Sequence, residues 1–258
     1  MFSKIEAATA RRNGEKMKYT FNAVVTPHDL DINNIASSSS VLRYMQEAAY
    51  RHLTVCPPTM DELRAENKVF VLSRLSFSIY DEIRFDDKLE ISTWPSESKG
   101  VSFPRSTRVR RNGDIVAELV SVWALIDPVK KTLWKADAYN PDFEYEEPIE
   151  LDLPVRLRIP SDVTLSLVGE HTVAYQDVDL NRHLNNTHYP DLICGFLPSM
   201  VGKRVVQMAI NYLHEAPLGE TLKVYISKED DGVFYVRTVL HDGSVNVEAQ
   251  IVTEEIAK

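Results

Sequence analysis

The chain has 258 residues, 44% of them hydrophobic, and a formal net charge of −9. This length and composition can supply a real core, in one large domain or in two closely packed halves. The negative charge disfavours nucleic acid and anionic membranes as partners. No apolar run reaches the ~18 residues of a membrane span. With no signal-like N-terminus and with Cys56 and Cys194 expected as free thiols, we expect a cytoplasmic location.

The first half shows a strand, a polar turn, a helix and then further strands. The first strand is predicted at residues 21–25 and the turn at residues 29–35. Apolar residues recur at helical spacing over residues 40–53, where Ser39 or Ser40 can cap the helix. The strands that follow are predicted at residues 70–79, 88–94, 103–111 and 115–127, with Asn112 and Gly113 as the hairpin signal.

Residues 137–160 contain four prolines among several glutamates, which predicts an extended linker. The second half then repeats the order of the first. A strand is predicted at residues 167–174, and a helix over residues 188–195 with Thr187 as its cap and Pro190 in its first turn. The later strands are predicted at residues 204–213, 221–227, 233–241 and 245–253, with Asp242 and Gly243 as the hairpin signal.

Three landmarks recur in the same order, which indicates an internal duplication. The pattern Asp-x-Asp-x-Asn occurs at residues 29–33 and 177–181, the segment 82–91 resembles 215–224, and the hairpin glycine recurs. Each copy is expected to be α+β, with one helix wrapped by an antiparallel sheet, and the two sheets can join into one surface. We therefore divide the chain into a tail (1–17), a first repeat (18–136), a linker (137–160) and a second repeat (161–258).

The polar segment 177–189 is the strongest candidate for a site. Turn and helix-cap preferences explain part of its composition. A calcium loop is not expected, because Arg182 and His188 stand where that loop needs glycine and glutamate. A zinc site from Asp179, His183 and His188 lacks a familiar ligand spacing. We expect neither a metal nor a cofactor.

The two copies of this turn differ at one informative position. The second copy has His183 where the first has Ile35. A duplicated fold needs only one set of chemical groups, so the second repeat is the candidate for chemistry. The first repeat is then the candidate for the ligand pocket.

The residues of the second turn match the signature Asp-x-Asn-x-His-x-Asn-Asn-x-x-Tyr through Asp179, Asn181, His183, Asn185, Asn186 and Tyr189. An acidic residue on the next strand, Glu215, completes the pattern. In this the chain resembles the acyl-[acyl-carrier-protein] thioesterase family. The first half agrees with the family at Gln46 and Glu47, at Thr93 and Trp94, and at Ser121 and Trp123. The resemblance covers residues 18–255 and implies a tandem (double) hotdog fold in a bacterial-type, cytoplasmic member.

One position departs from the family. Many plant members carry a cysteine after the glutamate, and this chain has Ala216 there. A Cys–His scheme is therefore excluded at that position, and Cys194 does not replace it by register.

The resemblance implies hydrolysis of the thioester of fatty acyl-[acyl-carrier-protein], which releases a free fatty acid. A thiolate is a tolerable leaving group, with a conjugate-acid pKa of about 8.5, so the reaction chiefly needs an activated water and oxyanion stabilisation. We expect Glu215 with His183 to activate the water, Asp179 to hold His183, and Asn181 to orient the carbonyl or the water. Backbone N–H groups at the helix start after Asn186 can bind the oxyanion. Direct attack by a carboxylate remains an open variant.

Contacts with the acyl chain and with its carrier are both expected in the first repeat. The acyl chain should lie under the first helix, against Val41, Met45, Leu72 and Phe77. Acyl carrier protein (ACP) is acidic, so Arg108 and Arg110 are candidates for its docking. Coenzyme A as the carrier, hydration of an acyl thioester, and non-catalytic acyl-thioester binding remain alternatives. A homodimer is also left open.

Overall fold

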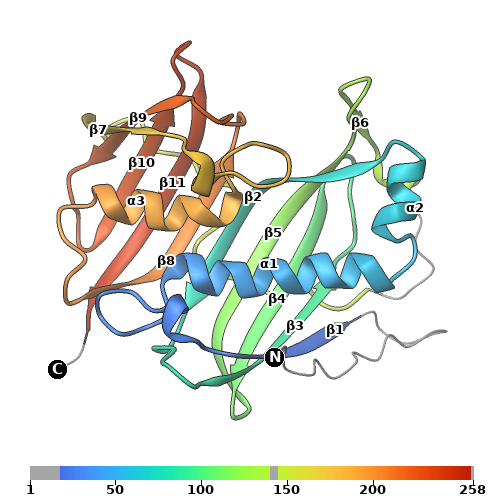
Figure 1. The fold of residues 1–258 in the computed structure, drawn as a ribbon, viewed down its shortest axis with the longest axis horizontal. Coiled ribbons are helices and arrows are strands. Elements are labelled where there is room, and N and C mark those ends of the chain that lie inside the picture. The colour runs from blue at the N-terminus through green and yellow to red at the C-terminus, as the bar shows by residue number, and fades with distance from the viewer. Residues whose placement is uncertain (1–17, 140–144, 257–258) are drawn as a thin grey trace.

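The structure, a computed structural model, describes residues 18–139 and 145–256. The predicted tail of residues 1–17 and part of the predicted linker lie outside the described residues. The fold is one long, curved antiparallel sheet with its two main helices on one face (Figure 1). Among the described residues no helix has the length and apolarity to cross a membrane.

The first repeat follows the predicted order. The long helix and the long strands are confirmed within a few residues, and two short elements, α2 and β6, are additional. Their bounds are β1 (Tyr19–Val24), η1 (Pro27–Asp29), α1 (Ser38–Val55), α2 (Met60–Ala65), β2 (Val69–Ile79), β3 (Lys88–Pro95), β4 (Phe103–Arg111), β5 (Asp114–Asp127), β6 (Thr132–Trp134) and η2 (Ala136–Ala138).

The second repeat has the same order with a shorter helix. Its bounds are β7 (Leu165–Thr172), η3 (Tyr175–Asp177), η4 (Asn186–His188), α3 (Tyr189–Phe196), β8 (Lys203–Tyr212), β9 (Thr221–Ser227), β10 (Val233–Val239) and β11 (Val245–Glu255).

The two sheets join at their centre, as the duplication predicts. The strand order is β1-β3-β4-β5-β2-β8-β11-β10-β9-β7, with β6 paired to β5. Strands β2 and β8 pair directly, and in that pairing Leu75 lies opposite Ile210 and Phe77 opposite Met208. All four of these side chains are fully buried. The tandem hotdog expectation is therefore confirmed: two helix-and-sheet units share one continuous sheet and one core.

Both helix caps differ from the prediction. The N-cap of α1 is Ser37, whose hydroxyl accepts a hydrogen bond from the Ser40 N–H at 3.1 Å, and not Ser39 or Ser40. Ser39 is buried and accepts from the Asp191 N–H at 2.9 Å, so it joins the starts of the two helices. In the second repeat a 3₁₀ turn precedes α3, and Asn185, not Thr187, caps that turn by accepting from the Thr187 N–H at 2.9 Å.

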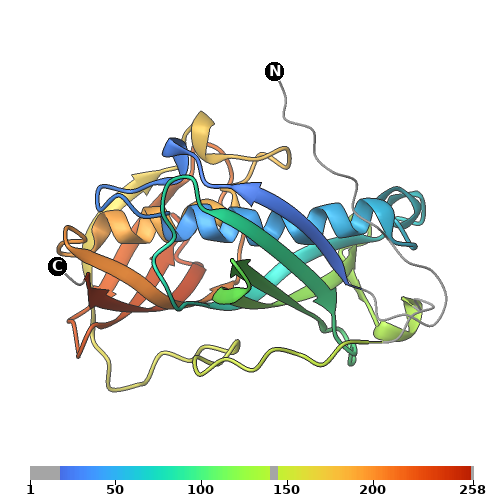
Figure 2. The same ribbon diagram turned by 90° about the horizontal axis from the view of Figure 1, so that it is seen from below.

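The linker crosses the sheet face opposite the helices (Figure 2). Residues 145–160 contain no helix or strand. The Ile149 N–H donates to Ser106 Oγ at 3.0 Å, and the Leu153 carbonyl accepts from Ser76 Oγ at 2.9 Å. Farther on, the Leu157 carbonyl accepts from Asn211 Nδ2 at 3.0 Å. The segment thus runs along the outer face of both repeats.

Asn33, in the polar turn of the first repeat, fastens this turn to the second repeat. Its Nδ2 donates to the carbonyls of Met200 (2.8 Å) and Lys203 (2.9 Å). Its Oδ1 accepts from the Gly202 N–H at 2.8 Å. Asn181, the equivalent residue of the second repeat, is exposed, so the two asparagines have different environments.

We expect Asn33→Ala to lower the free energy of unfolding by about 1–3 kcal/mol, since three hydrogen bonds are lost at a half-buried contact. Urea denaturation measures the change. Asn181→Ala is the matched control and should leave stability within about 0.5 kcal/mol of the wild type. Equal losses in the two variants would contradict a specific role for Asn33 in joining the repeats.

Candidate active site

The two polar turns share one backbone conformation. In the second repeat the Asp179 N–H donates to the His183 carbonyl at 3.1 Å, and the Asn181 N–H donates to Asp179 Oδ1 at 2.8 Å. In the first repeat the same two bonds join Asp31 to Ile35 and Asn33 to Asp31, each at 2.8 Å. The residue that follows each asparagine, Asn34 or Arg182, has a positive φ of about 60°. The backbone of the turn is therefore a structural feature of both repeats. The two turns differ in their side chains, with Ile35 in the first and His183 in the second.

His183 and Glu215 come together in the second repeat. His183 Nδ1 lies 3.3 Å from Glu215 Oε2, and their side chains are 33% and 70% exposed. The backbone fixes this approach, because the Leu184 N–H donates to the Ala216 carbonyl at 2.8 Å. The pair lies where water has access. The structure thus brings together two of the four predicted catalytic residues in direct contact.

Asp179 and Asn181 lie on the same turn but do not contact the imidazole. Asp179 uses one carboxylate oxygen to accept the Asn181 N–H, which shapes the turn. Both residues are exposed, and both line the cavity described below. Within residues 18–139 and 145–256, the carboxylate that faces His183 is that of Glu215.

The start of the second helix leaves a backbone donor at the site. Asn185 satisfies the N–H groups of Thr187, through its side chain, and of His188, through its carbonyl at 2.9 Å. The N–H of Asn186 has no hydrogen-bond acceptor among the described residues, and Asn186 lines the cavity. An unpaired N–H at a helix start favours a developing negative charge.

Asn246, which the sequence analysis did not identify, holds residues next to the catalytic pair by hydrogen bonds. It is fully buried on β11, its Nδ2 donates to the His214 carbonyl at 2.5 Å, and its side chain bonds the Tyr189 hydroxyl at 3.1 Å. The Tyr212 hydroxyl donates to the Asn186 carbonyl at 2.9 Å. Burial raises the pKa values of Tyr189 and Tyr212, so both phenols stay neutral and act as hydrogen-bonding supports. A polar residue within an apolar strand was the available signal for Asn246.

A cavity of about 720 Å³ leads from this pair along α1. Of the predicted substrate contacts, Leu72 lines this cavity, together with Ala49 and Leu53 from the C-terminal half of the helix. The other predicted substrate contacts, Val41, Met45 and Phe77, are not lining residues. They are completely buried in the shared core, because the N-terminal half of α1 packs directly on the sheet. The cavity therefore lies farther along the helix than the sequence suggested.

Gln46 contributes a polar group to the cavity from the first repeat. Its Nε2 atom is buried and has no hydrogen-bond partner among the described residues. An unsatisfied buried amide costs free energy, which a bound acceptor would offset. The sequence singled out Gln46 only as part of the family resemblance, with no role.

The family models for the acyl-ACP thioesterase N-terminal domain and C-terminal domain match residues 16–137 and 161–255. The chain belongs to the acyl-ACP thioesterase family. Among curated relatives, the chloroplastic palmitoyl-acyl carrier protein thioesterase of Arabidopsis thaliana is 23% identical over 210 residues, which cover 75% of this chain and 51% of the relative. The chain thus spans about half the length of the curated relatives it matches.

Two solved structures share the whole fold. An acyl-ACP thioesterase from Bacteroides thetaiotaomicron superposes with a TM-score of 0.84 at 22% identity, covering 92% of this chain and 98% of that one. The 12:0-ACP thioesterase from Umbellularia californica gives a TM-score of 0.80 at 17% identity, covering 93% and 98%. At these identities the likeness establishes the double hotdog fold.

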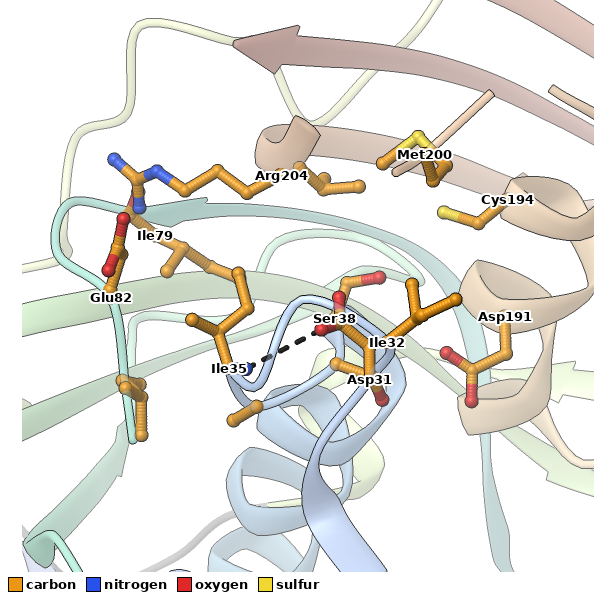
Figure 3. A pocket seen from close by; sticks show the side chains of 14 residues that line it. Asp31, Ile32, Ile35, Ser38, Ile79, Glu82, Asp191, Cys194, Met200 and Arg204 are labelled. Carbon is orange, nitrogen blue, oxygen red and sulfur yellow. Dashed lines mark hydrogen bonds between the residues drawn. The ribbon is translucent and has the colours of Figure 1, made fainter. Parts of the chain in front are cut away.

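This family member also contains a mirrored site in its first repeat, with a cavity of about 260 Å³ (Figure 3). Asp31, Ile35 and Glu82 stand where the second repeat has Asp179, His183 and Glu215. Ile35 is buried, and Glu82 pairs with Arg84. From α3, Cys194 faces this turn in the register that Gln46 occupies on α1. Burial raises the pKa of Cys194 to about 12, with Asp191 and Asp31 nearby, so the thiol stays protonated. The mirrored site has no imidazole to activate water.

A buried cation, Arg105, lies farther along the cavity of about 720 Å³ than the His183–Glu215 pair. Arg105 is 8% exposed, and its Nη1 donates to His52 Nδ1 at 2.9 Å and to Thr93 Oγ1 at 3.2 Å. Burial lowers the pKa of Arg105 to about 10. Burial also lowers the pKa of His52 to about 3, assisted by the Arg105 charge, so this imidazole is neutral.

The His52 shift predicts acid-sensitive folding. Unfolded histidine titrates near 6.5, so between about pH 6.5 and pH 3 the unfolded chain binds more protons than the folded one. The contribution of His52 to stability is therefore lost as the pH falls through this window, by up to ~1.4 kcal/mol per pH unit. Urea denaturation across the window should show a shallower pH slope for His52→Gln than for the wild type. The exposed His28 supplies the control, His28→Gln, and equal slopes in all three proteins would refute the assignment.

The docking prediction for Arg108 and Arg110 does not fit the geometry. Arg108 pairs with Glu118 at 2.6 Å, and its guanidinium lies over the Trp94 ring. Along β4 these arginines share a face with Ser106, which contacts the linker, whereas Arg105 faces α1. A carrier bound there would lie across the sheet from His183. Alternation along the strand could have separated these two faces in the sequence.

Proposed function

We propose that the chain hydrolyses the thioester of fatty acyl-ACP and releases a free fatty acid. The observation that carries this proposal is the His183–Glu215 contact at the mouth of a cavity whose walls are largely apolar and aromatic. An imidazole beside a carboxylate is suited to general-base catalysis, and such a cavity is suited to an acyl chain.

In the proposed reaction Glu215 accepts a hydrogen bond from the Nδ1–H of His183, so Nδ1 keeps its proton and Nε2 is free to act as the base. His183 Nε2 takes a proton from water as the water oxygen attacks the thioester carbon. The resulting oxyanion is stabilised by the Asn186 N–H and by Gln46 Nε2, two lining donors near the catalytic pair that have no acceptor among the described residues. The carbon–sulfur bond then breaks, and the thiolate takes the proton from the imidazolium. Asn181 keeps its expected role of orienting the carbonyl or the water. Asp179 was expected to hold His183, but Glu215 takes that place, and we propose that Asp179 shapes the turn that carries Asn181.

ACP is the carrier we propose, because the curated relatives are named as thioesterases of acyl carrier protein. The rim of the cavity has exposed apolar side chains, with Leu180 98% and Leu213 50% exposed. Exposed apolar groups beside a cavity mouth favour contact with a macromolecular carrier. We also propose a cytoplasmic setting, in keeping with the free thiols of Cys56 and Cys194.

Product analysis by mass spectrometry tests this function. Incubation with acyl-ACP should yield free fatty acid and ACP thiol in equal amounts, with the double-bond content of the acyl chain unchanged. A change in unsaturation with the thioester intact would instead identify a hydratase. Tight binding with neither product would identify a binder.

A further inference from the structure

The charged residues of the large cavity are separated by sign. Its two carboxylates, Asp179 and Glu215, belong to the catalytic end. Its cationic side chains, Arg64, Lys68 and Arg105, line the other end. Of these, Arg64 is exposed on α2 and Lys68 pairs with Glu66, whereas Arg105 is buried. The end of the cavity away from the catalytic pair is therefore electropositive, although its walls are otherwise mainly apolar.

Arg105 has no anionic partner in the part of the chain that the structure describes. Both of its hydrogen bonds come from Nη1 and go to the neutral groups of His52 and Thr93, and no carboxylate of the described residues pairs with it. Its Nε and Nη2 donors have no acceptor among those residues. A guanidinium carries five donors and cannot accept, so three N–H bonds remain available. A buried charge without a partner is costly, and a bound anion offsets that cost.

A second donor, on the His52 ring beside Arg105, has no acceptor among the described residues. Because a guanidinium only donates, His52 Nδ1 must accept, and the proton of the neutral ring is on Nε2. His52 Nε2 is buried and has no partner among the described residues. The contact pair of Arg105 and His52 therefore has N–H groups on both residues that lack an acceptor among the described residues.

The position of Arg105 relates these donors to the acyl chain. Its partner His52 lies six residues after Gln46 on α1, which is a rise of ~9 Å along the helix. On β4, Arg105 shares a face with Phe103, whose ring packs edge-on against Phe70 and Tyr139 at 5.3 and 5.8 Å between centroids. An acyl chain with its thioester at His183 would thus extend past apolar walls toward Arg105.

We propose, building on the thioesterase function above, that this cavity selects acyl chains whose far end carries an acceptor oxygen, foremost a carboxylate. The guanidinium of Arg105 receives that oxygen through Nε and Nη2. A purely apolar cavity would reject such a chain, because the charged end would have to give up its water without compensation.

The test compares CoA thioesters of equal chain length that end in a methyl, a hydroxyl or a carboxyl group, over a series of lengths. At the best length the wild-type kcat/KM for the carboxyl-ended chain should equal or exceed that for the methyl-ended chain. Arg105→Met should lower the carboxyl-to-methyl ratio about 10–100-fold, and Arg105→Lys should lower it less, because the charge remains. Arg110→Met, on the linker side of the same strand, is the matched control and should keep the wild-type ratio.

Binding of the corresponding CoA thioethers, which cannot be hydrolysed, is measured beside the kinetics by calorimetry. If neither these CoA thioesters nor the matching acyl-ACP is hydrolysed, the proposed function fails, while carboxyl-selective thioether binding that depends on Arg105 still supports the cation site. The inference is overturned if the wild type rejects oxygenated ends at every length, or if Arg105→Met affects all chain ends equally. Selection of the hydroxyl-ended over the carboxyl-ended chain would retain the acceptor site and overturn the assignment to a carboxylate.

Discussion

His183→Ala should hydrolyse acyl thioesters about 10²–10⁴-fold more slowly than the wild type, because it removes the general base. Glu215→Gln should show a loss of the same order, since the amide keeps the shape but no longer stabilises the imidazolium at the 3.3 Å contact. In both variants kcat should fall while KM changes little, because neither side chain is assigned to hold the acyl chain. Steady-state assays of thiol release, with circular dichroism to verify folding, give the result.

The first repeat supplies the control for this prediction. Glu82 occupies the position equivalent to Glu215 but pairs with Arg84, beside an isoleucine in place of the histidine. Glu82→Gln should therefore retain wild-type kcat. If Glu82→Gln is as inactive as Glu215→Gln, catalysis does not belong to the second repeat alone.

Gln46→Leu is expected to lower kcat by about 10²–10³-fold, the usual cost of losing one oxyanion donor. Leucine is close in volume to glutamine and favourable in a helix, so α1 should keep its packing. The buried Nε2 has no other partner among the described residues, so stability should be unchanged or slightly higher. The measurement pairs kcat on a carrier-bound acyl chain with the urea midpoint.

Cys194, which takes the equivalent position on α3, is the matched site for comparison. Cys194→Ala alters only the mirrored cavity of the first repeat and should leave kcat unchanged. Should Gln46→Leu keep full kcat while losing stability, the glutamine is a packing residue and the oxyanion is bound elsewhere.

Most of the fold could be predicted from the sequence, because the internal duplication requires the same order of helices and strands in both halves. Long periodic segments such as α1 and β2 have strong patterns, and the similarity of segments 82–91 and 215–224 identified Glu82 as the equivalent of Glu215. Short elements were missed, since the six residues of α2 give too little periodicity. The available signal for α2 was a capping box, in which Thr59 accepts from the Glu62 N–H and Glu62 accepts from the Thr59 N–H.

The site was predicted only in part because tertiary placement decides it. The His183–Glu215 pair followed from a motif, but Gln46, Arg105 and Asn246 come from three separate elements, and no local pattern joins them. For the substrate contacts, hydrophobicity alone could not separate a lining residue such as Leu72 from core residues such as Met45. The distinction depends on the point along α1 at which the helix stops packing directly on the sheet and borders the cavity instead.

The most direct test of the account is thiol release from acyl-ACP by the wild-type chain, run beside acyl-CoA and the Glu215→Gln variant. We expect release from acyl-ACP, with a higher kcat/KM than from acyl-CoA of the same chain, and its near-complete loss in the variant. The account would be contradicted by an enzyme that binds acyl-ACP and releases no thiol, or by a Glu215→Gln variant as active as the wild type.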